Sequence, residues 1–205
     1  MPRKPEPEFE LSGGVLCLDF ANTLSERGSP KRSFDYLHGY DDLVVFAREE
    51  GILTRREESE LLKFSQIKPQ GRARVHRVAV TLREAIYRVF AAQVKSEEAM
   101  PKDVKMIEDF TREAIRHREL CYAGQQYRWE WKPGYDERLG WVLWPIAESA
   151  AELLTSARLK KVRACAGARC EWLFLDESRN HSRRWCDMKV CGNREKARRH
   201  YEQQH

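Results

Sequence analysis

The sequence contains no run of about 18 or more apolar residues, the length that a membrane-spanning helix requires. Its first residues, Met1 to Glu8, combine proline with charged side chains and lack the apolar segment of a secretory signal. From both absences we expect a cytoplasmic protein without a membrane partner. In that reducing environment the six cysteines are expected to be thiols or metal ligands, and a disulfide is disfavoured.

Motifs that commonly identify enzymes are also missing. There is no glycine-rich phosphate loop, no nucleophile elbow and no set of three metal ligands with an open fourth position. The adjacent acids Asp41 and Asp42 stand where a helix is expected to begin, and acidic side chains favour helix N-termini. We therefore expect a protein that binds its partners and catalyses no reaction.

The hydrophobic residues, 41% of the chain, suffice for a packed core and recur mostly at helical spacing. The clearest helix is expected from about Arg72 to Lys95. Others are expected near 16–24, 41–50, 54–64 and 143–154, and from Pro101 with Val104, Ile107, Ala114 and Ile115 turned inward. Short strands are expected at 9–14 and, with one half-buried face, at 127–131. The predicted fold class is mainly α with small β elements.

The composition changes near residues 156 to 159, where we place a domain boundary. A helical domain is predicted at 1–156, and a small domain at 157–205. From Arg158 to His205 there are 13 Lys and Arg against 6 Asp and Glu, a net charge of +7, so the remaining residues carry −2 of the total +5. A basic tail on a slightly acidic body suits a polyanion partner. A merely solvated surface is the alternative that charge alone leaves open.

The small domain contains two pairs of cysteines with equal spacing. Cys165 and Cys170 are separated by four residues, as are Cys186 and Cys191, and fifteen residues lie between the pairs. Two close thiol pairs joined by a short insert are typical of zinc fingers, so we predict one structural zinc ion on these four cysteines. An iron–sulfur cluster, or a site in which His181 or His200 replaces one cysteine, remains open. Cys17 and Cys121, among apolar neighbours, are expected in the core.

The small domain has too few apolar residues to fold unaided at its length. A structural zinc ion contributes on the order of 10–16 kcal/mol of apparent binding free energy, which offsets the deficit. Residues 160–164 and 172–175 are predicted to form a hairpin, and a helix follows with Asn193 as its N-cap and with Ala197 and Tyr201 turned inward. Gly192 is predicted at positive φ. A hairpin followed by a helix describes a treble-clef-like finger. Four protein ligands leave no open position, so the ion is structural.

Several segments of the small domain resemble the bacterial CGNR zinc finger family: Trp172 to Asp176, Ser178 to Asn180, Arg183 to Cys186, and Cys191-Gly192-Asn193-Arg194. Upstream, Gly13-Gly14, Leu18 to Phe20 and Asn22-Thr23 resemble the ABATE domain that usually precedes this finger. The resemblance implies a stress-induced transcription regulator with a basic finger that binds DNA and an N-terminal effector or dimerisation domain. A homodimer is one expectation that follows.

The residues expected to contact DNA phosphates lie in and after the second half of the finger. Arg194, Arg198 and Tyr201 share one stripe of the terminal helix. The preceding loop adds Arg179, Arg183 and Arg184. The alternative is that these cations compensate the net −2 charge of a zinc ion bound by four thiolates. An adaptor that binds RNA or protein with the same finger is the competing function.

Polar side chains interrupt the first apolar helix, and they suggest a small-molecule effector pocket. These are Asp19, Asn22 and Thr23, followed by Arg27. The alternative is that they cap helices and form buried hydrogen bonds within the domain.

Overall fold

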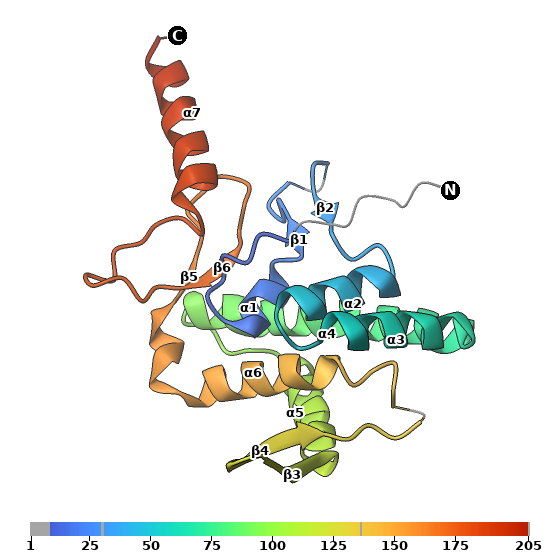
Figure 1. Ribbon diagram of the computed structural model, residues 1–205. Coiled ribbons are helices and arrows are strands. Elements are labelled where there is room, and N and C mark those ends of the chain that lie inside the picture. The colour runs from blue at the N-terminus through green and yellow to red at the C-terminus, as the bar shows by residue number, and fades with distance from the viewer. Residues whose placement is uncertain (1–8, 30, 136, 205) are drawn as a thin grey trace.

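The computed structural model describes residues 9–29, 31–135 and 137–204, and they are mostly helical (Figure 1). The helices are α1 (Leu16–Ala21), α2 (Tyr40–Glu49), α3 (Arg55–Gln66), α4 (Pro69–Val94), α5 (Pro101–Arg116), α6 (Leu143–Thr155) and α7 (Asn193–Gln204). A 3-10 turn, η1 (Ala157–Lys161), and a π turn, η2 (Met188–Gly192), complete them. Three antiparallel pairs form the β structure: β1 (Leu24–Ser25) with β2 (Phe34–Asp35), β3 (Arg118–Ala123) with β4 (Gln126–Trp131), and β5 (Val162–Ala164) with β6 (Leu173–Leu175). The predicted fold class is confirmed.

The core of the helical body surrounds α1 and the middle of α4. Cys17, Leu18 and Phe20 of α1 are fully buried, so that even this short helix is covered by its neighbours. Helices α4 and α6 both pack on α1, and α5 packs on α4 and α6. In Figure 1, α4 runs behind α1 and α6 runs below it.

Local sequence signals set several helix boundaries as predicted. Gly51 takes φ 73° directly after α2, a left-handed conformation that glycine adopts without strain. Thr54 and Glu57 form the predicted capping box, in which the N–H of Glu57 donates to the Thr54 hydroxyl at 3.2 Å and the N–H of Thr54 donates to the Glu57 carboxylate at 2.8 Å. Pro101 begins α5 as predicted, and α4 begins at Pro69, three residues before its predicted start near Arg72; in the first turn of a helix a missing N–H costs nothing.

Some predicted faces and elements were wrong. Val104 and Ile115 of α5 are 42% and 60% exposed, because only the Ile107 and Ala114 side of this helix meets α4 and α6. Residues 9–12 form no strand. Strand β4 exists, but its aromatic residues Tyr127 and Trp129 are exposed, since among the described residues only β3 pairs with it and the hairpin leaves the body.

The C-terminal unit has the predicted order of hairpin and helix. Val162 pairs with Leu175 and Ala164 with Leu173, which leaves a connection that contains the first two cysteines. Helix α7 starts at Asn193 and points away from the body (Figure 1); Asn193 is itself helical, at φ −69° and ψ −39°, because the π turn leads directly into α7, so it is not the predicted N-cap. Its Ala197 and Tyr201 are exposed and not turned inward, because the helix has no facing element over most of its length.

Strand β6 is shared between two cores. Successive strand residues point to opposite faces, and here both faces are buried. Leu173 and Leu175 belong to the core of the helical body, whereas Phe174 and the preceding Trp172 pack around the four cysteines. The finger is therefore built onto the body through its central strand.

Among the described residues, none of the helices combines the length and the apolar character needed to cross a bilayer.

Candidate metal centre

The first cysteine pair occupies the tight connection between β5 and β6. The N–H of Cys165 donates to the carbonyl of Trp172 at 2.8 Å, which extends the ladder by one step. The N–H of Cys170 donates to the carbonyl of Gly167 at 3.0 Å and closes the turn. The chain then rejoins β6 through Glu171 in the left-handed region at φ 55°. This backbone directs both sulfurs to the same side of the hairpin.

In the second pair, Cys191 lies in the π turn that leads into α7, and Cys186 precedes that turn. The carbonyl of Asp187 accepts the N–H groups of Cys191 and Gly192, at 3.0 and 3.1 Å. The Asp187 carboxylate caps the turn by accepting the N–H of Val190 at 2.8 Å. Gly192 lies inside this turn and is not one of the glycines with positive φ, so that prediction was wrong. It makes room for Met188, whose sulfur would lie 2.4 Å from an added Cβ atom.

The four sulfurs converge on a single point. The Sγ atom of Cys186 lies 3.6 Å from those of Cys170 and Cys191, and all four sulfurs lie within 4.8 Å of one another. A tetrahedron with zinc–sulfur bonds of about 2.3 Å requires sulfur–sulfur distances of about 3.8 Å. The arrangement therefore fits one zinc ion on Cys165, Cys170, Cys186 and Cys191, as the spacing predicted.

The same distances decide between the alternatives. A disulfide requires about 2.05 Å between sulfurs, and all six cysteines are free. An iron–sulfur cluster places several irons and bridging sulfides between its thiolates, which requires a wider set of ligands. Among the described residues, no histidine belongs to this cluster, and the His181 ring bonds to the carbonyl of Asp176 at 3.1 Å. Four thiolates complete the coordination, so the ion is structural.

The surroundings of the sulfurs favour a bound cation. All four cysteines are buried together with Trp172 and Phe174. Cys170 and Cys186 keep their protons and donate them to the Cys165 sulfur, which raises the pKa of both thiols, because the sulfurs cannot all ionise side by side. A divalent ion allows all four to become thiolates and releases their protons.

The loop between the two pairs is fixed by an acid and an arginine. The buried Asp176 carboxylate accepts the N–H of Ser178 and the N–H of Arg183, both at 3.0 Å. The Arg183 guanidinium donates to the carbonyls of Trp185, at 2.9 Å, and of Cys186. It also lies 4.5 Å from the centre of the Phe174 ring. These contacts make Arg183 part of the scaffold that presents Cys186.

Direct hydrogen bonds fasten the finger to the helical body. The Asn22 side chain spans both backbone groups of Leu173, donating to its carbonyl at 2.8 Å and accepting its N–H at 2.9 Å. The indole of Trp172 donates to the carbonyl of Leu24 at 3.0 Å. The N–H of Leu175 donates to the carbonyl of Gly13 at 2.8 Å. These bonds hold β6 against the segment that contains α1.

The other side chains predicted to line an effector pocket also bond to protein groups. Asp19 accepts the N–H of Gly13 at 2.7 Å, and the Thr23 hydroxyl donates to the carbonyl of Phe20 at 2.8 Å. Arg27 forms two hydrogen bonds to the carboxylate of Glu84, at 2.7 and 3.1 Å. Capping and buried hydrogen bonding, the alternative weighed from the sequence, account for their positions.

A cavity of about 370 Å³ lies between the body and the finger, and none of the four predicted pocket residues lines it. Its lining includes Ser25, Glu26 and Tyr36 from the body and Trp172 and Arg194 from the finger. Arg194 forms an ion pair with Glu26 at 2.9 Å.

The predicted nucleic-acid residues fall into three kinds of environment. Arg183 is engaged within the finger, as described above. Arg194 and Arg198 form surface ion pairs, Arg194 with Glu26 and Arg198 with Glu195 and Glu202. The remaining three are exposed: Arg179, Arg184, whose guanidinium lies 5.3 Å from the Trp185 ring, and Tyr201, at 64%.

The structure adds one arginine that the sequence did not single out. Arg169, from the first cysteine turn, lines a cleft of about 80 Å³ together with Arg194 and Arg198. Cys170 and Cys191 form part of the same cleft. Arg169 is 25 residues from Arg194 along the chain, and only the closure of the metal site brings them together.

A closed site of four thiolates, on a hairpin and helix carried by a helical body, defines a protein with a structural zinc finger. Two family models match the chain in that order. ABATE, described as "Putative stress-induced transcription regulator", matches residues 14–157, and the CGNR zinc finger matches residues 161–204. The first match spans more than half of the chain, and the chain belongs to the ABATE family. No curated protein matches it significantly.

Proposed function

We propose that this protein is a transcription regulator that binds duplex DNA through the basic surface of its zinc finger, and that it carries no catalytic step. The observation that carries the proposal is the group of Arg169, Arg194 and Arg198, which lines one cleft beside the metal site at the start of the projecting helix α7. Arginine forks suit phosphate oxygens, and the major groove of B-DNA is wide enough for an α-helix.

The ion pairs of these arginines do not prevent contact with phosphate. Arg194 and Arg198 keep 50% and 47% of their side chains exposed while paired. Exposed pairs of this kind contribute about 0–1 kcal/mol each, because water and salt screen them. Several phosphate contacts, each releasing counterions, outweigh that cost. Zinc-site compensation accounts for some of the charge near the sulfurs but not for Arg179, which lies exposed in the loop.

The direct test is the salt dependence of binding to duplex DNA, measured by fluorescence anisotropy. We expect binding at low salt whose logarithm falls linearly with the logarithm of salt concentration. Arg194→Ala and Arg198→Ala should each reduce that slope by about 1 and weaken binding to all sequences alike. Arg56→Ala, an exposed arginine on α3, is the matched control and should change neither.

A substitution of Glu26 should strengthen DNA binding, whereas the arginine substitutions should weaken it. Glu26→Gln removes the carboxylate that pairs with Arg194, so duplex binding should become tighter by about two- to fivefold at low salt. The proposal is wrong if no duplex binding occurs at low salt, or if the arginine variants bind as well as the unchanged protein. Tighter binding of RNA or single strands at matched salt would support the adaptor function instead.

The proposal also includes a signal that regulates DNA binding. A stress response, a cytoplasmic location and a small-molecule effector are expectations from the sequence and the family. A ligand in the cavity of about 370 Å³ would lie beside the Arg194–Glu26 pair, the polar link between the body and α7. Such a ligand would change the charge presented to DNA.

A further inference from the structure

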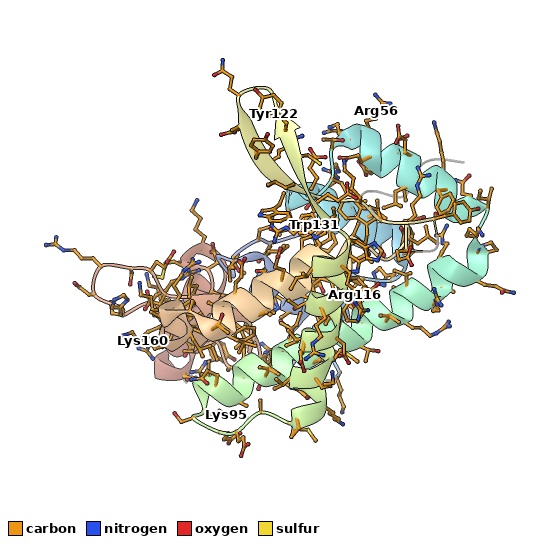
Figure 2. All side chains as sticks on the ribbon, turned by 90° about the horizontal axis from the view of Figure 1, so that it is seen from below. Arg56, Lys95, Arg116, Tyr122, Trp131 and Lys160 are labelled. Atoms are coloured by element: carbon orange, nitrogen blue, oxygen red, sulfur yellow. The ribbon has the colours of Figure 1, made fainter. Side chains whose placement is uncertain are left out.

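The hairpin β3–β4 presents an apolar face that the body leaves uncovered. Its register pairs Leu120 with Trp129 and Tyr122 with Tyr127, which places these side chains on one face. They are 55–67% exposed. Figure 2 shows the hairpin standing clear of the helices, with Tyr122 toward its free end and Trp131 at its base. Contiguous exposed aromatic residues mark interaction sites, and a two-stranded sheet alone is only marginally stable.

Strand β4 also has a free edge. Within the described part of the chain it pairs only with β3. The N–H of Lys132, one residue beyond β4, donates to the carbonyl of His117 at 2.7 Å and continues the ladder. Since hydrogen bonding alternates along an antiparallel pair, Tyr127, Trp129 and Trp131 direct their N–H and carbonyl groups away from β3. These groups are a template for another strand.

The charges on the polar face of β4 identify the strand that fits. In an antiparallel pair of two β4 strands centred on Trp129, Arg128 lies opposite the partner's Glu130, and symmetry repeats the contact. Both contacts fall at positions without backbone hydrogen bonds, where side chains approach most closely. In the single chain the same Arg128 and Glu130 already attract each other at 2.7 Å along the strand.

Other registers are disfavoured. Centring the pair one residue earlier places Arg128 opposite itself, and one residue later places Glu130 opposite itself and Arg128 opposite Lys132. Centring it on Trp131 places Trp129 opposite Pro133, which has no N–H to donate. The strand is therefore self-complementary in one register.

We propose that β4 pairs with β4 of a second copy of this chain, antiparallel and centred on Trp129, to form a symmetric dimer with a continuous four-stranded sheet. Tyr127 then lies beside the partner's Trp131, so that the aromatic faces of the two hairpins join. The interface involves no residue of the finger, and the proposal does not depend on DNA binding.

Charge reversal tests the register in the full zinc-loaded chain. Sedimentation velocity is expected to show a dimer for the unchanged protein. Arg128→Glu and Glu130→Arg should each raise the dimer dissociation constant by about tenfold or more, because two attractive contacts become repulsive. The combination of both substitutions restores opposite charges and should restore the dimer. Arg56→Glu makes the same charge change on α3 and should have no effect.

Amide hydrogen exchange identifies the edge that pairs. In the dimer the amides of Tyr127, Trp129 and Trp131 should be protected, and in Arg128→Glu they should exchange rapidly. The amides of Arg128 and Glu130 donate to β3 and should stay protected in both, which shows that the variant hairpin is folded. A monomeric unchanged protein, a double variant that stays monomeric, or a dimer without protection of the outward amides would each overturn the proposal.

Discussion

At the scale of single residues, the most consequential side chains join the two parts of the molecule. Asn22 is 2% exposed, and its side chain is hydrogen-bonded to strand β6 at Leu173, 151 positions away along the chain. Its amide matches both backbone groups of Leu173, which no other described residue would otherwise satisfy at that point of β6. Because buried backbone groups must be paired, this position couples the body to the finger.

Replacement of Asn22 by Leu should therefore destabilise the protein strongly. The variant leaves a buried N–H and a buried carbonyl without partners, at about 1–3 kcal/mol each, so we expect a loss of about 2–6 kcal/mol. Urea unfolding measures it. Ser25→Ala removes an exposed hydrogen bond to Phe34 and should cost less than about 1 kcal/mol. Equal losses for the two variants would contradict this role.

The buried carboxyl of Asp19 should make the stability of the protein depend on pH. Burial raises the pKa of its carboxyl to about 6, although hydrogen bonds from Gly13 and Val15 oppose the shift. A carboxyl whose pKa is higher in the folded than in the unfolded state favours folding while it is protonated. Its stabilising contribution is complete below about pH 4 and is lost as pH rises through about 6.

Asp19→Asn keeps an acceptor for the N–H of Gly13 and cannot ionise. We expect this variant to be more stable than the unchanged protein by about 2 kcal/mol at pH 7.5, with the difference vanishing only below about pH 4. Zinc binding weakens in acid for both proteins, so the comparison at each pH isolates the carboxyl. A constant difference at both pH values would rule out this assignment.

At the scale of elements, the sequence predicted what depends on neighbours along the chain. The capping box at Thr54, the proline that begins α5, and the hairpin and helix around the cysteines follow from local backbone requirements. The exposure of individual side chains could not be predicted from the local sequence in the same way. Apolar spacing shows that a face exists but not which element covers it, so Val104 and Ile115 were placed inward and are exposed.

Substitutions of Asp187 test how the π turn η2 holds Cys191 in place for the metal. Asp187→Ala removes the cap of the π turn and should cost about 1 kcal/mol of stability. Because Cys191 belongs to that turn, zinc should pass to a competing chelator several times faster than from the unchanged protein. Asp187→Asn keeps the acceptor and is the matched control. Unchanged transfer rates for Asp187→Ala would show that the sulfurs alone position the turn.

At the scale of the whole molecule, the boundary predicted near residue 156 does not separate two independent cores. Val162, Leu173 and Leu175 complete the core of the body, whereas Phe174 completes the surroundings of the metal. The sequence shows that residues of β6 alternate between two apolar faces. It does not show which residues each face meets, because α1 and the cysteines lie far from each other along the chain. The cleft that includes Arg169 escaped prediction for the same reason.

A chain that ends at residue 156 should consequently lose cooperative folding. It lacks three buried side chains of the body core, each worth about 1.5–3 kcal/mol of burial, and the sum is comparable to the total stability of an ordinary domain. Thermal unfolding followed by circular dichroism should show a broad or absent transition. A chain that ends at residue 196 keeps both cores and should unfold cooperatively. A sharp transition for the shorter chain at the temperature of the full protein would contradict the shared core.

One zinc ion held by four sulfurs is the central feature of this molecule. X-ray absorption at the zinc edge, with metal analysis of the purified full chain, measures that site. We predict one zinc ion per chain and a first shell of four sulfurs at about 2.3 Å. Replacing Cys186 by Ser should remove the ion, whereas replacing Cys17, which is outside the cluster, should not. A purified chain without zinc, or a first shell that contains a histidine nitrogen, would contradict the account.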